Sequence, residues 1–208
     1  MEEQLSLFDF HCDGLVCGCD EAGRGPLAGP VAAAACILPP DFDFSILNDS
    51  KKLSEKQRLE AEAVIRKKAA AFSIVFISAQ EIDEINILQA TMKAMKLCYE
   101  EIRAKEKISV FYVDGNRKPD IRDTEVEAVI RGDGKIPSIM AASILAKTAR
   151  DRLMLELDRL YPQYGFARNK GYGTKEHYAA LQKYGPCPEH RRTFLRTLSS
   201  HQGKSESH

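Results

Sequence analysis

The sequence has no apolar run approaching the roughly 20 residues that a membrane-spanning helix requires. Its N-terminal stretch, MEEQLSLFDF, is acidic where a secretory signal would be basic. The six cysteines include no Cys-x-x-Cys pair and no Cys/His pair of the kind that binds zinc, so free thiols in a reducing compartment are the better interpretation. These absences predict a cytoplasmic protein that does not associate with a membrane.

Net charge is absent as well, because 30 Lys and Arg residues balance 30 Asp and Glu residues. The charge is unevenly distributed, however: residues 164–196 contain seven basic and two acidic residues, which leaves this segment at +5. Tyrosines and phenylalanines are interleaved with these charges. The mixture suits a groove where phosphates meet cations and sugars or bases meet rings. A solvated pair of helices with a small core of its own would give the same composition.

Whole-chain disorder is excluded, because 44% of the 208 residues are hydrophobic. The length fits one domain, or one domain with a small appendage. Apolar runs at 15–22 and 30–38 flank a turn-forming segment and indicate a hairpin. Ser54 with Gln57 forms a capping box, which predicts that a helix begins there.

The other predicted elements alternate between helices and strands. Helices are expected over 54–71, 80–105, 137–160 and 175–184, strands over 72–79, 108–115 and 124–134, and a short last helix after Pro188. This order favours an α/β fold with a mixed central sheet flanked by helices and a small C-terminal helical appendage.

Four acidic residues stand where a predicted strand meets a loop or helix: Asp20, Glu21, Asp114 and Asp133. Functional groups gather at strand ends, because the strands hold them in place while the loops vary. Carboxylates that lie within a few ångströms raise each other's pKa unless a cation sits among them. Oxygen ligands favour Mg²⁺ or Mn²⁺, and two ions ~3.5–4 Å apart would suit attack on a phosphodiester. Each acid alone is more often a cap or turn residue.

The GRG segment at 23–25, followed by Ala28, formally fits the dinucleotide-binding pattern G-x-G-x-x-A. That pattern must open a helix, whereas Pro26 and Pro30 lead into a strand-like run here. The context therefore excludes a dinucleotide site, and a plain turn remains one interpretation of the segment.

Six blocks of sequence, in order, resemble the signature blocks of bacterial ribonuclease HII over about residues 15–195. They are CDEAGRGPLAGPV at 19–31, DSKKLS at 49–54, YVDGN at 112–116, RGD and MAASILAKTARD within 131–151, GYGT at 171–174 and HRRTF at 190–194. The resemblance implies a ribonuclease H-like fold. It also implies an endonuclease that cleaves the RNA strand of RNA/DNA hybrids and nicks DNA 5′ of an embedded ribonucleotide, leaving 3′-hydroxyl and 5′-phosphate ends.

The resemblance also implies a division of the chain and a set of metal ligands. A catalytic domain is expected over 13–160 and a substrate-binding appendage over 161–198, between a flexible tail at 1–12 and a disordered tail at 199–208. Carried over residue by residue, the catalytic ligands of Mg²⁺ or Mn²⁺ are Asp20, Glu21, Asp114 and Asp133. Asp20 is expected to be shared between the metals.

The nucleic-acid contacts that the resemblance implies are Gly23, Arg24, Gly25, Ser50, Lys51, Tyr172 and Arg191. The GRG backbone would sense a ribose 2′-hydroxyl, since only a bare backbone approaches a sugar so closely. Tyr172 would stack on the neighbouring deoxyribose, and Lys51 would contact phosphate as a point charge. His190 and Arg191 are expected to make structural or phosphate contacts.

Three further residues are interpreted from spacing alone, without the resemblance. Lys147, Arg150 and Asp151 lie one helical turn apart or closer, which predicts an ion-pair cluster. His177 is predicted to lie at the surface.

Two other functions compete with a ribonuclease. A different nuclease or a resolvase of the same fold would share the acids but not the test of the sugar, and Arg24 and Tyr172 argue against it. A non-catalytic RNA/DNA-hybrid binder would need no clustered acids. The related ribonuclease HIII has a Gly-Lys-Gly loop and an extra N-terminal domain, so the GRG loop favours type HII. A monomer is expected.

The N-terminal peptide Gln4-Leu5-Ser6-Leu7-Phe8 resembles the QLxLF motif with which bacterial replication and repair proteins bind the DNA sliding clamp. Leu7 and Phe8 would be the buried anchors, while Gln4 would supply hydrogen bonds and Leu5 further apolar contact. The alternative is that the segment packs on its own domain.

Overall fold

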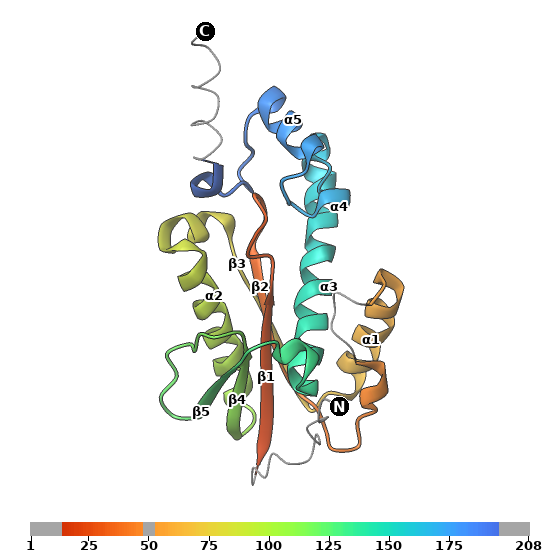
Figure 1. The fold of residues 1–208 in the computed structure, drawn as a ribbon, viewed down its shortest axis with the longest axis vertical. Helices are drawn as coiled ribbons and strands as arrows, with labels where there is room; N and C mark the ends of the chain where they lie inside the picture. The colour runs from red at the N-terminus through yellow and green to blue at the C-terminus, as the bar shows by residue number, and fades with distance from the viewer. Residues whose placement is uncertain (1–13, 48–52, 196–208) are drawn as a thin grey trace, which may run out of the picture.

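The computed structural model describes residues 14–47 and 53–195, which form a five-stranded sheet and its flanking helices (Figure 1). The strands lie in the order β3-β2-β1-β4-β5, with β1 at the centre. Their bounds are β1 (Leu15–Ala22), β2 (Val31–Ile37), β3 (Ala71–Ile77), β4 (Ile108–Asp114) and β5 (Glu125–Val129). The β1–β2 and β2–β3 pairs are antiparallel, whereas β4 is parallel to both β1 and β5. The predicted mixed sheet is confirmed.

Helices cover both faces of the sheet. On one face lies α2 (Ala79–Arg103), whose buried side chains pack against β1, β2 and β4. On the other lie α1 (Glu55–Lys68) and α3 (Pro137–Leu160), as Figure 1 shows. Strand β2 is buried along its whole length, since its alternate residues face opposite helices. Together with the sheet, these helices confirm the predicted α/β fold.

The helix boundaries follow local chemistry. The predicted capping box is confirmed, with Ser54 and Gln57 exchanging side-chain and backbone hydrogen bonds at the start of α1. Pro137 lies in the first turn of α3, where its missing N–H costs nothing. The sequence predicts an uninterrupted helix over 80–105, but Asn86 breaks α2 with a φ of 66°. Its side chain accepts hydrogen bonds from the N–H groups of Leu88 and Gln89 and so caps the following turns.

Two sequence predictions of elements are wrong in detail. The strand expected over 124–134 ends at Val129, because Arg131 adopts a left-handed conformation and Gly132–Gly134 form a 3₁₀ turn. The loop expected before α5 (Lys175–Tyr184) contains a short helix, α4 (Phe166–Asn169). The last helix predicted after Pro188 is present as a helical turn that begins at residue 192.

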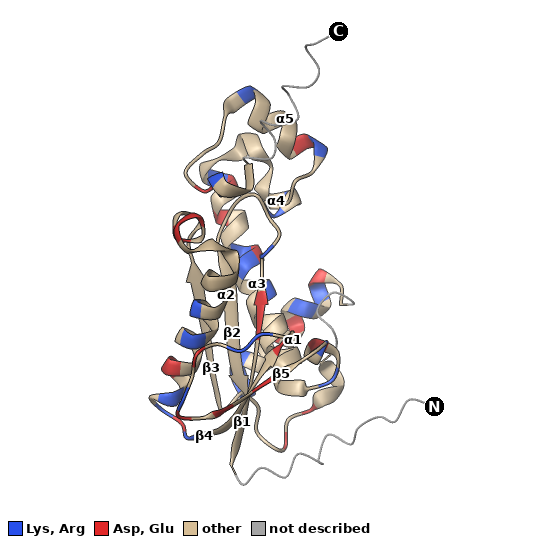
Figure 2. Ribbon diagram, turned by 60° about the vertical axis from the view of Figure 1, so that its left-hand side comes forward, with Lys and Arg blue, Asp and Glu red and all other residues tan. Residues whose placement is uncertain are grey.

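The part of the chain beyond α3 lies against the upper end of that helix in Figure 1, where it shares a small apolar cluster with Ala28, Met154 and Leu157. Figure 2 shows Lys and Arg recurring around α4 and α5. Among the described helices, none combines the length and the apolar character that crossing a membrane requires. Four residues of the expected clamp peptide and two expected phosphate contacts lie outside the described residues: Gln4, Leu5, Leu7, Phe8, Ser50 and Lys51.

Candidate active site

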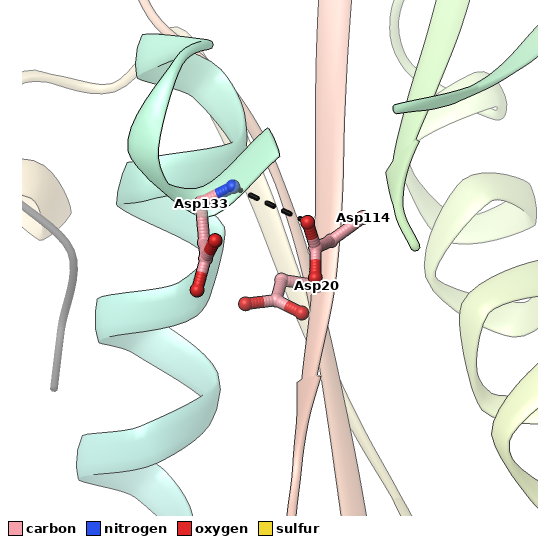
Figure 3. A group of neighbouring side chains, drawn as sticks. All are labelled: Asp20, Asp114 and Asp133. Carbon is pink, nitrogen blue, oxygen red and sulfur yellow. Dashed lines mark hydrogen bonds between the residues drawn. The ribbon is translucent and has the colours of Figure 1, made fainter. Parts of the chain in front are cut away.

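Three of the four predicted acids meet on the α3 face of the sheet (Figure 3). Asp20 comes from β1 and Asp114 from the end of β4, its parallel neighbour, where Cys19 pairs with Val113. Asp133 comes from the 3₁₀ turn before α3. One carboxylate oxygen from each of the three acids lies within 4.8 Å of those of the others.

Backbone hydrogen bonds fix the third acid against the second. Oδ1 of Asp114 accepts a hydrogen bond of 2.6 Å from the N–H of Gly132 and one of 3.3 Å from that of Asp133. The left-handed Arg131 turns the chain sharply enough to aim both donors at this carboxylate. A Cβ at Gly132 would lie 2.6 Å from Cδ1 of Ile139, so a side chain there would have to displace the tip of Ile139.

Close packing of α3 on β1 completes the cluster. A Cβ at Gly18 would lie 2.3 Å from the backbone nitrogen of Ile139, so the helix can approach the strand only because Gly18 has no side chain. This approach brings the Ser143 side chain into hydrogen-bonding contact with Asp20. The backbone N–H of Glu21 donates a second hydrogen bond to Asp20, at 2.7 Å.

The cluster is electrostatically costly without a cation. Burial, followed by the charge of Glu21, raises the pKa of Asp20 well above its usual range, and Asp114 adds to the effect. Hydrogen bonds from Ser143 and from the backbone oppose the shift. A set of carboxylate oxygens crowded in this way fits a hard divalent cation, which would offset the repulsion and the desolvation together.

The fourth predicted acid, Glu21, does not join this three-acid group. Its Oε1 lies 3.5 Å from Nη1 of Arg24, with which it forms an ion pair. Burial raises the pKa of Glu21, and the charge of Arg24 opposes the shift. Both residues line a cavity of about 270 Å³, whose full lining is Asp20, Glu21, Ala22, Gly23, Arg24, Gly25, Asp114, Ser143, Lys147, Arg150 and Tyr172.

Two buried arginines shape the loop that borders this cavity. Arg150 does not belong to an ion-pair cluster: it donates hydrogen bonds to the carbonyl oxygens of Ala28, Pro30 and Lys170. The ion pair in that helix joins Lys147 to Asp151, at 2.6 Å.

Arg191, expected as a nucleic-acid contact, has no exposed surface in the structure. Its guanidinium donates to the carbonyl oxygens of Gly23, Arg24 and Gly29 at 2.6–3.0 Å. Burial and then the charge of Arg150 lower the pKa of Arg191 to about 9. Its donors are therefore engaged with the loop, which supports the structural one of the two roles expected for this residue and contradicts a direct phosphate contact.

The arginine contacts determine which way the loop peptides face. Because the carbonyls of Gly23 and Arg24 point at Arg191, the N–H groups of the same trans peptides, which belong to Arg24 and Gly25, point away from it. Within the described residues, neither N–H has a hydrogen-bond acceptor. Toward the described part of the chain these two donors are unpaired, and the loop that carries them lines the same cavity as Asp20 and Asp114.

Gly23 and Gly25 are glycines for different reasons. Gly23 has a φ of 94°, and a Cβ there would lie 2.0 Å from Nε of Arg150, so the fold requires glycine. Gly25 has no such φ, and its Cβ would meet only Cε1 of Tyr172, at an ordinary 3.6 Å. Packing within the protein therefore does not explain the missing side chain at Gly25.

Tyr172 lines the same cavity, with 47% of its surface exposed. The N–H of Leu27 donates to the carbonyl of the neighbouring Gly171 at 2.8 Å, which ties the two loops together. A Cβ at Gly171 would lie 2.3 Å from the carbonyl oxygen of Ala28, so this contact depends on glycine. The GRG loop and the tyrosine loop thus form one connected rim.

A buried pair of histidines, which the sequence patterns did not predict, lies behind this rim. His177, predicted at the surface, has no exposed area, and its Nε2 lies 3.0 Å from Nε2 of His190. One signal could have revealed it: His177 lies three and four residues before Ala180 and Leu181, so it shares the inward face of α5.

The chain matches the family model described as Ribonuclease HII over residues 17–198. It is 54% identical over 200 residues to the ribonuclease HII of Caldanaerobacter subterraneus, covering 94% of this chain and 82% of that protein. It is 55% identical over 181 residues to the ribonuclease HII of Dechloromonas aromatica, covering 87% and 91% of the two chains.

Solved structures agree with the sequence matches. The ribonuclease H2 of Pyrococcus horikoshii superposes with a TM-score of 0.72 at 25% identity, covering 92% of this chain and all of that one. A ribonuclease HII solved in complex with PCNA, from Archaeoglobus fulgidus, gives a TM-score of 0.68 at 27% identity over 85% and 93% of the chains. This chain therefore belongs to the ribonuclease HII family and is an endoribonuclease of ribonuclease H type 2.

Proposed function

We propose that the chain is a metal-dependent endonuclease that cleaves the RNA strand of RNA/DNA hybrids and incises DNA on the 5′ side of an embedded ribonucleotide. The products are a 3′-hydroxyl and a 5′-phosphate. One observation carries the proposal: Asp20 and Asp114 open into the same cavity as Gly25 and Tyr172. The groups suited to breaking a phosphodiester and those suited to testing a sugar therefore face one substrate.

Asp20, Asp114 and Asp133 would hold Mg²⁺ or Mn²⁺, with Glu21 beside them at the cavity wall. When bound, the ions activate water for attack on phosphorus and stabilise the departing 3′ oxygen. The chain's own part is to hold the carboxylates together through the hydrogen bonds of Ser143 and the Gly132 N–H.

The loop donors distinguish RNA from DNA in this proposal. A ribose 2′-hydroxyl can accept a hydrogen bond from the free N–H of Arg24 or Gly25, and deoxyribose offers no such group. A side chain at Gly25 would occupy the space that the sugar needs. Tyr172 would pack on the next sugar, where a hydroxyl is absent. This selectivity favours a ribonuclease over another nuclease or a resolvase of the same fold.

Phosphate contacts are proposed for Ser50 and Lys51 from the DSKKLS block that precedes α1. Lys147 lines the cavity near Asp20 and is the described lysine best placed to face a phosphate there. Contacts of this kind fix the register of a duplex without reading its sequence. Binding would therefore weaken as salt is added, and it would survive loss of the metal site.

The proposal is tested with four duplexes of one sequence: all DNA, one with a single ribonucleotide, an RNA/DNA hybrid and all RNA. Cleavage of the second and third, dependent on Mg²⁺ or Mn²⁺ and stopped by a chelator, is the expected result. Cleavage of the all-DNA duplex at a similar rate would show that the loop does not test the sugar. Cleavage that continues in the chelator would exclude a metal-dependent reaction.

We also propose that residues 4–8 bind the DNA sliding clamp, which would deliver the enzyme to replicated DNA. Two features support this: the motif itself, with its apolar Leu5, Leu7 and Phe8, and the relative from Archaeoglobus fulgidus that was solved in complex with PCNA. Changing Leu7 and Phe8 to Ala is expected to abolish binding to the purified clamp in calorimetry and to leave cleavage of short duplexes unchanged. Equal clamp binding by the variant, or none by the wild type, would reject the peptide.

A further inference from the structure

A continuous chain of hydrogen bonds runs through the core behind the tyrosine loop. The backbone N–H of Cys187 donates to Nδ1 of His190 at 3.0 Å. Nε2 of His190 lies 3.0 Å from Nε2 of His177. Nδ1 of His177 lies 2.9 Å from the carbonyl oxygen of Tyr172. The chain therefore connects the segment before the last helical turn to the loop that carries Tyr172.

The fixed donor at one end sets the tautomer of each histidine. Because the N–H of Cys187 points at it, Nδ1 of His190 must be an unprotonated acceptor, and Nε2 of His190 carries the proton. Nε2 of His177 then accepts that hydrogen bond, which leaves the proton of His177 on Nδ1. Nδ1 donates to the Tyr172 carbonyl, which can only accept. Every member of the chain is satisfied when both imidazoles are neutral.

Packing holds both rings in the planes that this chain requires. The ring of Tyr164 meets His190 edge-on, with centroids 4.8 Å apart, and the ring of Phe166 meets His177 edge-on at 5.4 Å. The hydroxyl of Tyr164 donates to the carbonyl of Gly185, which anchors that ring in turn. A rotation of either imidazole would break its hydrogen bonds and disturb these contacts.

We propose that His177 and His190 are positioning residues that hold Tyr172 over the cavity of the acid cluster and so help to read the sugar beside a ribonucleotide. The inference rests on the proposed contact of Tyr172 with substrate. The carbonyl of Tyr172 also accepts from the N–H of Thr174, at 2.9 Å. The Thr174 contact closes a local turn, and the His177 contact adds the link to the rigid interior.

The histidine pair fixes the direction of the Tyr172 carbonyl. An apolar pair could fill the same space, but it would leave the Tyr172 carbonyl with one donor instead of two and would not define its direction. The held carbonyl and the ring belong to the same residue, Tyr172. A small rotation of its peptide therefore moves the ring across the cavity. Displacement by about 1 Å at a substrate-positioning group can cost on the order of a hundredfold in rate.

The hydrogen-bond chain through the two histidines is tested by NMR on the full-length wild type, independently of any substrate. Long-range proton–nitrogen correlation spectra distinguish protonated from unprotonated ring nitrogens. We expect the proton on Nδ1 of His177 and on Nε2 of His190 at neutral pH, with slow exchange of both. A proton on Nε2 of His177, or fast exchange between tautomers at either ring, would overturn the proposed chain.

The role of the hydrogen-bond chain is tested with two variants of His177, of which only one retains an N–H donor for the Tyr172 carbonyl. His177→Phe keeps a ring against Phe166 but removes both nitrogens, whereas His177→Asn retains an N–H near the place of Nδ1. For His177→Phe we expect the ratio of kcat/KM on the single-ribonucleotide duplex to that on the RNA/DNA hybrid to fall about tenfold, mainly through kcat. For His177→Asn we expect the ratio to return to within about threefold of the wild type.

Circular dichroism and denaturation separate this effect from unfolding. Equal ratios in the wild type and a folded His177→Phe protein would reject the positioning role, as would failure of His177→Asn to restore the ratio. If His177→Phe does not fold, the kcat/KM ratio of His177→Asn is compared with that of His190→Asn. His190→Asn keeps an acceptor for the N–H of Cys187 but leaves Nε2 of His177 without a donor, so its ratio is expected to be the lower of the two. Equal ratios in these two proteins would reject the positioning role. Tyr172→Ala is the separate control: an unchanged ratio there would reject the proposed substrate contact while leaving the tautomers as they are.

Discussion

The guanidinium of Arg191 donates a hydrogen bond of 2.6 Å to the carbonyl oxygen of Gly23, 168 residues earlier in the chain. Through this bond and those to Arg24 and Gly29, the C-terminal segment 190–194 shapes the GRG loop at 23–25. The contact turns the loop carbonyls inward and its two free N–H groups outward. A basic residue expected at the nucleic-acid surface therefore acts from inside the protein.

Arg191→Lys is expected to destabilise the fold and to loosen this loop. An ammonium group cannot span three carbonyls as the planar guanidinium does, so buried acceptors lose their donors. We expect the free energy of unfolding to fall by about 2–4 kcal/mol, measured by urea denaturation. Arg192→Lys is the matched control, because Arg192 is exposed and its change should stay within about 0.5 kcal/mol. Equal stability of the Arg191→Lys protein and the wild type would contradict the role of Arg191.

Asp20→Asn is expected to stabilise the metal-free protein, since it removes one charge from three crowded carboxylates. Mn²⁺ is expected to raise the melting temperature of the wild type, because a ligand that binds only the folded state stabilises it, and the same change is expected to abolish this rise. Scanning calorimetry with and without Mn²⁺ measures both effects. A variant that Mn²⁺ stabilises as strongly as the wild type would remove Asp20 from the metal site.

Gly23→Ala and Gly25→Ala are expected to act differently: the first lowers stability, whereas the second impairs cleavage. Gly23→Ala is expected to lower stability, because its positive φ and the contact with Arg150 leave no room for a methyl group. Gly25→Ala is expected to keep stability within about 0.5 kcal/mol and to lose cleavage at a single ribonucleotide. Thermal denaturation and a cleavage assay on both proteins check this. A stable, fully active Gly25→Ala protein would show that no sugar approaches that backbone.

Stability is expected to fall as the pH decreases from about 6.5 toward 4. Burial, and then the neighbouring His177, lowers the pKa of His190 to about 4, while Arg192 adds to the effect and the Cys187 backbone opposes it. An unfolded histidine titrates near pH 6.5, so between these values the unfolded chain binds more protons and is favoured. The stability linked to neutral His190 is fully present above pH 6.5. About 2–3 kcal/mol of the free energy of unfolding is lost by pH 4.

Urea denaturation at several pH values measures this dependence. The carboxylates of the protein also titrate at low pH, so the comparison is made with His190→Gln, which has no titratable group at that position. The difference in unfolding free energy between the two proteins is expected to shrink as the pH falls through this window. A difference that is independent of pH would mean that His190 does not stay neutral in the folded state.

Much of the fold could be predicted because the elements are marked locally. Ser54 with Gln57 and Pro137 mark helix starts, and the apolar runs mark the strands. Asp20 and Glu21 near the end of β1 and Asp114 at the end of β4 could be located for the same reason, whereas Asp133 lies in a 3₁₀ turn that the sequence did not predict. Parallel pairing of β1 with β4 then brings Asp20 beside Asp114 without further information.

The parts that sequence reasoning missed depend on contacts between distant segments. Arg150 and Arg191 are ordinary basic residues in the sequence, and their acceptors lie 20 to 168 residues away along the chain. His177 becomes a buried residue only because Tyr164, Phe166 and His190 enclose it. Hydrophobic periodicity can place His177 on the inward face of α5, but it does not report the distant residues that satisfy its two ring nitrogens.

The most direct test of the proposed function is to map the ends produced from a duplex with one ribonucleotide, labelled on either side of it, in Mg²⁺. A cut is expected at the phosphodiester 5′ of the ribonucleotide, with a 3′-hydroxyl on the DNA side and a 5′-phosphate on the ribonucleotide, and no product is expected with Asp20→Asn. These ends arise when water attacks phosphorus. A cut on the 3′ side, a 2′,3′-cyclic phosphate, or activity of Asp20→Asn within tenfold of the wild type would contradict the proposed function.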